Sequence, residues 1–85
     1  MSELHIETFK AIAVGKNWPT TVAITDTEFT LQIDEPVEED GTNSGPNPMQ
    51  YFAASLAGCQ NEQAQVVAEE LEVKLSKIII DLELD

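Results

Sequence analysis

The feature that most constrains this chain is one long stretch without a strong helix breaker, from Asn47 to about Glu70. Asn47 suits an N-cap and Pro48 a first helical residue, and only Gly58, which a helix tolerates, interrupts the rest of the stretch. The stretch predicts a helix of about 23 residues, or about 35 Å at 1.5 Å per residue. In a chain of 85 residues, the remaining segments have to cover the apolar surface of this helix.

Apolar and small residues spread over more than half of the circumference of this helix. Alanines are frequent in its N-terminal half, which would allow another backbone to approach closely. One stripe is formed by Met49, Phe52, Leu56, Cys59, Gln63 and Val66, and beside it lie Ala53, Ala57, Val67 and Leu71.

The segments before the helix have the pattern of strands. Residues 4–14 are apolar on both faces, which predicts a strand covered on both sides or a bulge near Thr8 and Phe9. Residues 20–24 and 29–33 alternate cleanly on either side of a short polar turn, which predicts an antiparallel hairpin with one buried face.

Two further segments complete the pattern. The acidic stretch Asp34–Pro48 is rich in Gly, Asn and Pro, and we expect an exposed, solvated loop. Pro36 and Val37 occupy positions where an EF-hand would need calcium ligands, so this is no EF-hand loop. Val73–Leu84 alternates apolar residues with acids and predicts a last strand.

The predicted fold class is therefore α+β, in the order β-β-β-α-β, with an antiparallel meander packed on one long central helix. One small sheet can cover only one side of a helix whose apolar surface exceeds half of its circumference. A second layer is missing from the chain, and a second copy is the simplest source. We therefore expect a homodimer.

Composition excludes several classes of partner and site. Sixteen acids against four lysines, with no arginine, argue against nucleic acids and anionic membranes. A single cysteine excludes an intrachain disulfide and a multi-cysteine metal site, and we expect neither a metal nor a cofactor. The N-terminal "MSELHIETFK" has no signal-peptide apolar run, and no stretch approaches membrane-spanning length, so a cytoplasmic location is expected.

Three consecutive motifs carry a resemblance to a known family. The strand "FTLQIDEP" (residues 29–36), the loop "GTNSGPNP" (residues 41–48) and "QYFAASLAGC" (residues 50–59) resemble the OsmC/Ohr family, the osmotically inducible and organic hydroperoxide resistance proteins. The resemblance implies an intertwined homodimer with two sheets wrapped around central helices. It also implies that residues 1–85 form a single OsmC-like domain that lacks the family's C-terminal half.

The resemblance further implies thiol peroxidase chemistry, in which a helix cysteine attacks an organic hydroperoxide. Cys59 matches the position of that cysteine. Lys16, after Gly15, is the nearest candidate for the family's activating arginine, and Met49 stands where the family has a glutamate. The family's second, resolving cysteine has no counterpart in this sequence.

The residues around Cys59 leave its role open. It lies about three turns into the helix, where the helix dipole contributes little, and a net charge of −12 opposes a thiolate. Lys16 would have to supply the activating cation, while Gln63, one turn after Cys59, suggests a polar pocket or a hydrogen bond across a dimer. The alternative is a small apolar residue in a packed helix contact. His5, Trp18 and Tyr51 are interpreted as ordinary strand and packing residues.

The sequence thus favours an OsmC-like thiol redox protein that reduces organic hydroperoxides in oxidative-stress defence and is recycled by an external thiol reductant. Whether it is an enzyme stays open. The alternative is a non-catalytic, dimeric OsmC-like binding or scaffold domain that has lost peroxidase activity. A third interpretation is a shortened version of a longer protein.

Overall fold

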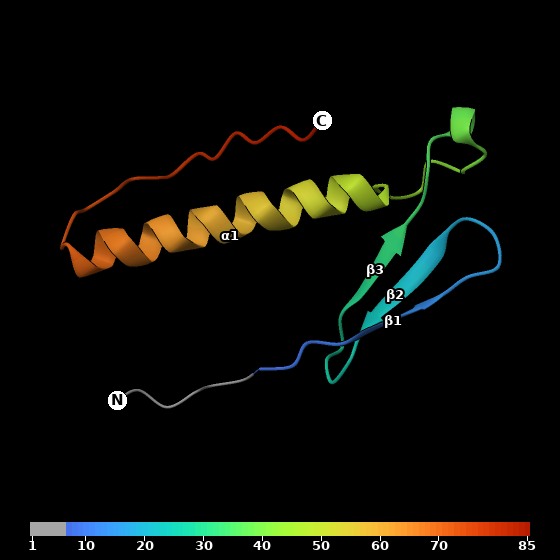
Figure 1. The fold of residues 1–85 in the computed structure, drawn as a ribbon, viewed down its shortest axis with the longest axis horizontal. Helices are drawn as coiled ribbons and strands as arrows, with labels where there is room; N and C mark the ends of the chain where they lie inside the picture. The colour runs from blue at the N-terminus through green and yellow to red at the C-terminus, as the bar shows by residue number, and fades with distance from the viewer. Residues whose placement is uncertain (1–6) are drawn as a thin grey trace. The chain divides into compact units, whose positions relative to one another are not determined.

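A computed structural model describes residues 7–85, and the chain divides into two compact units, residues 1–47 (unit 1) and 48–85 (unit 2). The elements occur in the order β1 (Ala11–Val14), β2 (Thr20–Ile24), β3 (Thr30–Ile33), a 3-10 turn η1 (Val37–Glu39) and α1 (Pro48–Glu70) (Figure 1). The structure is α+β, with a small antiparallel sheet preceding one long helix. The described residues contain no helix long and apolar enough to cross a membrane.

The sheet of unit 1 confirms the predicted hairpin. Its strands are antiparallel in the order β1-β2-β3. The turn between β2 and β3 places Asp26 in the left-handed region, with φ 66°, and the Thr27 hydroxyl donates to the Ile24 carbonyl oxygen at 2.8 Å. A short polar side chain tolerates this backbone region better than an apolar one, which fits the polar turn in the sequence.

The strand register gives the sheet one apolar face, which we call the apolar sheet face. Cross-strand partners such as Ala13 and Val22, or Val22 and Leu31, lie on the same side of the sheet. The apolar residues of β2 and β3 on this face are half-buried. The face is formed by Ala11, Ala13, Val22, Ile24, Leu31 and Ile33.

The first strand is shorter than expected. The predicted strand forms only from Ala11 to Val14, and neither a strand nor the alternative bulge lies at Thr8 and Phe9, while Leu4, His5 and Ile6 lie outside the described residues. All four residues of β1 are exposed. Within residues 7–85 it is an edge strand that pairs with β2 alone.

The helix α1 has the predicted limits, Pro48–Glu70. It ends because Glu72 turns into the left-handed region at φ 55°. The Glu72 amide then donates to the Glu69 carbonyl oxygen at 3.1 Å, and the Val73 amide donates to the Ala68 carbonyl oxygen at 2.8 Å. These two bonds form a Schellman motif, which satisfies carbonyl groups that the helix end would otherwise leave free.

The predicted last strand is absent. Residues 73–85 contain no strand and run back along α1 as an extended segment (Figure 1). A strand requires a neighbouring strand for its backbone hydrogen bonds, and a helix cannot supply one. Side chains of the segment nevertheless alternate in burial, since Ile78, Ile80 and Leu82 are half-buried while Ile79 is 75% exposed.

The helix half-buries only part of the apolar surface that the sequence predicted. Leu56 of the predicted stripe and Ala53 and Ala57 beside it are half-buried, as are Asn61, Ala64 and Ala68. The other large apolar residues of the stripe, Met49 (60%), Phe52 (52%) and Val66 (41%), are exposed. Within residues 7–85 no apolar side chain is fully buried. The described part of one chain therefore has no closed hydrophobic core.

Candidate functional site

Cys59 lies on α1 and is an exposed free cysteine. Gln63 lies one helical turn later and is also exposed, so the two side chains share one side of the helix. Phe52 and Val66, seven residues before and after Cys59, belong to the same exposed stripe. The thiol is thus accessible to a small molecule in one chain, on a helix face that combines apolar side chains with one amide.

Lys16 lies in unit 1, in the connection between β1 and β2, and is exposed. It lines a hollow of about 360 Å³ together with Trp18, Thr20 and Asp40. Cys59 and Gln63 belong to unit 2. The role of Lys16 as the activating cation therefore stays a prediction.

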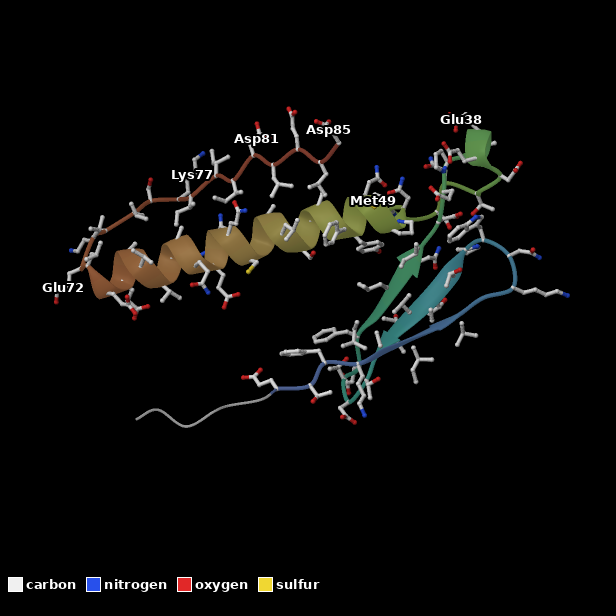
Figure 2. The ribbon with its side chains drawn as sticks, in the orientation of Figure 1. Glu38, Met49, Glu72, Lys77, Asp81 and Asp85 are labelled. Carbon is white, nitrogen blue, oxygen red and sulfur yellow. The ribbon has the colours of Figure 1, made fainter. Side chains whose placement is uncertain are left out.

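The first turn of α1 carries Met49, at the position where the resemblance implies a glutamate. Figure 2 labels Met49 at the start of α1. Its side chain is 60% exposed, and the first turn of the helix contains no acid. Tyr51, in the same turn, is half-buried, which agrees with a packing role. α1 therefore supplies a cysteine and an amide near the centre of its exposed face but no carboxylate in its first turn.

Asp34 is a residue that the sequence pattern did not single out. It was expected in an exposed loop, yet its side chain is 0% exposed, which makes that part of the prediction wrong. Its Oδ1 accepts from the amides of Glu35 at 2.7 Å and Thr42 at 3.1 Å. Its Oδ2 accepts from the Ser44 amide at 3.0 Å, from the Ser44 hydroxyl at 2.6 Å, and from the Thr42 hydroxyl.

These five donors determine the charge state of Asp34. Burial by itself raises the pKa of the carboxyl group, but the hydroxyls of Ser44 and Thr42 and the amides of Thr42 and Glu35 outweigh it and hold the pKa well below its usual range. The carboxylate is therefore ionised in the folded loop. It serves as a template around which residues 35–44 wrap.

Two glycines permit this wrapping. A Cβ atom at Gly41 would collide with the Glu35 carbonyl oxygen, and one at Gly45 would collide with that of Gln32. The two ends of the loop are also joined, because the Asp34 amide nitrogen donates to the Pro46 carbonyl oxygen at 3.0 Å. The sequence signal for this structure is an aspartate at the end of a strand, with threonine and serine after it in a glycine-rich loop.

Unit 2 contains a groove of about 560 Å³ between the second half of α1 and the segment after it. Asn61, Gln65, Glu69, Leu75 and Lys77 contribute to its walls. The Asn61 amide nitrogen donates to the Ile78 carbonyl oxygen at 2.8 Å and ties the segment to the helix. No group of three or more potential metal ligands gathers anywhere in residues 7–85.

Comparison with protein-family models gives one finding that decides the family. The model of the OsmC-like proteins matches residues 41–85, slightly more than half of the chain. The chain belongs to the OsmC-like protein family. The matched residues include the glycine-rich loop end, α1 with Cys59, and the extended segment after it.

The family assignment confirms the resemblance of the motifs at residues 41–48 and 50–59, whereas the motif at residues 29–36 lies before the matched region. Comparison with curated protein sequences and with solved structures gives no match. The three-stranded antiparallel sheet and the single long helix agree with an OsmC-like fold.

Proposed function

We propose that this OsmC-like protein is a thiol redox protein whose Cys59 reduces organic hydroperoxides in the cytoplasm. The observation that carries the proposal is that Cys59, the cysteine of the family-matched region, lies exposed on α1. A thiol has to be reached by its oxidant, and a buried structural cysteine is inert. Gln63, on the same helix side, supplies a polar group beside the thiol.

The proposed step converts the Cys59 thiolate and a hydroperoxide ROOH into a sulfenic acid and an alcohol, with the O–O bond broken and a proton taken up from solvent. An external thiol then condenses with the sulfenic acid to form a mixed disulfide and water. A second thiol molecule releases Cys59 as the free thiol and leaves as part of a small-molecule disulfide. External thiol is needed because the sequence holds one cysteine.

The test is the consumption of cumene hydroperoxide by the full chain in the presence of excess dithiothreitol. We expect peroxide to disappear many times faster than with dithiothreitol alone, with one thiol lost per chain when the reductant is left out. Cys59→Ser should abolish both effects, and Gln63→Ala should slow the reaction while leaving the thiol titratable. A rate for Cys59 equal to that of free cysteine would contradict the proposal.

A second candidate function is a non-catalytic, dimeric binding or scaffold domain. The observation that favours it is Met49, an exposed thioether where this kind of site would hold its carboxylate. Met49→Glu separates the two functions. If the chain is a peroxidase that lacks only this group, the variant should react faster, whereas a scaffold domain should gain no activity.

We also propose that the protein is a homodimer, in which residues 1–85 of each copy act as one OsmC-like domain. The support is the absence of any fully buried apolar side chain in residues 7–85, together with large exposed apolar residues in both units. Leaving such surface in water is costly, at roughly 25 cal/mol per Å². A second copy would cover it.

A further inference from the structure

The asparagines of this chain differ in how easily they can react with their own backbone. An asparagine is thermolabile, because the backbone nitrogen of the next residue can attack its side-chain amide carbon. Of the four asparagines in the sequence, Asn47 is followed by a proline, whose nitrogen carries no hydrogen. Asn61 lies inside α1, where helical hydrogen bonds hold the next amide. Asn17 precedes a bulky tryptophan, whereas Asn43 precedes a small serine in a loop, so Asn43 has the most reactive local sequence.

The loop holds both backbone amides around Asn43. The residue is exposed, and its backbone lies in the left-handed region at φ 55°, which asparagine tolerates. The Asn43 amide nitrogen donates to the Glu35 carbonyl oxygen at 3.0 Å. The Ser44 amide nitrogen, which would be the attacking atom, donates to Asp34 Oδ2 at 3.0 Å. Attack requires the Ser44 nitrogen to turn toward the Asn43 side chain, and this hydrogen bond prevents the turn.

The charge of Asp34 opposes the reaction as well. The Ser44 nitrogen has to lose its proton before it attacks, and a buried carboxylate at 3.0 Å disfavours a negative charge there. Asp34 does not replace an external base, because the donors around it hold its pKa well below its usual range. In the closed loop, Asn43 is therefore kept from reacting by one carboxylate.

We infer that Asn43 is a deamidation site whose rate is set by the Asp34 carboxylate, and that its conversion prevents the loop from closing again. In the reaction, the Ser44 nitrogen bonds to Cγ of Asn43 and the bond from Cγ to Nδ2 breaks. The proton of the attacking nitrogen ends on the departing one, so ammonia leaves and a succinimide ring remains. Water then opens the ring at either carbonyl and gives aspartate or isoaspartate. The inference concerns unit 1 alone and does not depend on the chemistry of Cys59.

Either product disfavours the present loop. Isoaspartate adds one carbon to the main chain between residues 43 and 44. The amides on the two sides of this carbon are bonded to Glu35 and Asp34, and a longer chain cannot keep both bonds. Aspartate keeps the chain length but adds a negative charge beside residues 34–40, which already carry five acids. Conversion therefore follows opening and makes it permanent.

The pair Asp40–Gly41 offers a similar ring closure, but we expect it to react after Asn43. The attacking nitrogen there is also held, since the Gly41 amide donates to the Pro36 carbonyl oxygen at 3.0 Å. Aspartate side chains are ordinarily ionised near neutral pH, and a carboxylate is a poor electrophile. An asparagine amide has no such charge.

The first test follows deamidation by peptide mapping and mass spectrometry in the full chain, incubated at mildly alkaline pH. A synthetic peptide of residues 38–48 carries Asn43 in the same local sequence without Asp34 and gives the rate of an open loop. We expect Asn43 to convert at least about tenfold more slowly in the full chain, because the reaction has to wait for local opening. Equal rates would overturn the inference.

Three variants assign the protection to Asp34. Asp34→Asn should raise the rate at Asn43 close to that of the peptide, whereas Glu38→Gln, the same chemical change on an exposed side chain, should leave it unchanged. Thr42→Val removes a single hydroxyl donor to Asp34 from an exposed residue and should give an intermediate rate. It decides the question if circular dichroism shows that Asp34→Asn does not fold. Conversion in Thr42→Val no faster than in the native chain would contradict the inference.

The last test asks whether conversion keeps the loop open. Anion exchange separates the converted chain, which carries one additional negative charge. We expect a glutamate-specific protease to cleave it faster after Glu38 and Glu39 than it cleaves the unconverted chain. Asn43→Gly suits the left-handed backbone but cannot form the ring, so the same incubation should leave its cleavage rate unchanged. Equal cleavage of converted and unconverted chains would show that the loop closes again.

Discussion

At the scale of single residues, Asp34 is the side chain on which the structure of its loop depends most. Its carboxylate is removed from water and accepts five hydrogen bonds from residues 35–44. An ionised acceptor binds amide and hydroxyl donors more strongly than a neutral one does. The conformation of the loop between β3 and α1 therefore depends on one charged side chain.

Replacing this carboxylate by an amide tests that dependence. Asp34→Asn keeps the size but converts one acceptor oxygen into a donor that faces the Ser44 and Thr42 donors, so hydrogen bonds are lost and a buried group is left unsatisfied. We expect the thermal midpoint to fall by about 5 °C or more. Glu38→Gln, which makes the same chemical change at an exposed position, should shift it by less than about 2 °C. Equal shifts would show that Asp34 has no special role.

The pH dependence of stability should report the same group. The pKa of Asp34 is depressed in the folded state, so its stabilising effect is fully present above the ordinary aspartate value near 4 and declines as the pH falls below it. The stability difference between the native chain and Asp34→Asn should therefore be constant near neutral pH and shrink steadily below about pH 4. Urea titrations at several pH values measure it. A difference that grows on acidification would contradict the assignment.

At the scale of elements, unit 2 is a long helix with an extended segment laid along it. The helix ends at Glu70 because of the Schellman motif at Glu72, and the chain then reverses. A short set of contacts holds the segment, among them the bond from Asn61 to Ile78 at 2.8 Å. Gln65 donates to the Asn61 side-chain oxygen at 2.5 Å and helps to orient it.

Removing this anchor should loosen the segment without unfolding the helix. Asn61→Ala deletes the bond to Ile78, at a cost of about 1 kcal/mol, while alanine itself favours the helix. We expect faster tryptic cleavage after Lys74 and Lys77 and unchanged helical circular dichroism. Glu62→Ala, at the next and exposed position, should leave the cleavage rate unchanged. An unchanged cleavage rate in Asn61→Ala would mean that apolar contacts alone hold the segment.

At the scale of the whole molecule, the described part of the chain exposes many large apolar side chains. Met49 and Phe52 in unit 2, and Phe9 and Phe29 in unit 1, are all more than half exposed. Soluble proteins that fold alone place such side chains in a core, and contiguous exposed apolar surface marks a site for another chain. These exposed side chains support the proposed homodimer.

Stability should therefore depend on protein concentration. If the folded form is a dimer, mass action makes its thermal midpoint rise as the chain concentration increases. We expect a rise of several degrees over a hundredfold range of concentration. Differential scanning fluorimetry with Trp18 and circular dichroism both measure it. A midpoint independent of concentration would exclude the dimer.

Local chemistry made several features predictable from the sequence. The helix limits derive from Asn47 and Pro48 at one end and from the loss of a continuing pattern at the other, and the hairpin derives from clean alternation around a polar turn. The motifs around Cys59 identified the family. These are properties of neighbouring residues, so the linear sequence contains them.

Only the tertiary structure decided the rest, because those features depend on residues distant in sequence or on another chain. Asp34 is buried because Thr42 and Ser44 come back to it, which the acidic composition of the loop concealed. Residues 73–85 have the pattern of a strand but form none, since strand formation requires a neighbour that the described chain does not place beside them. Most of the stripe with Cys59 stays exposed, while Ala53, Ala57 and Ala64 are half-buried, because a thin segment can cover only one narrow side of the helix.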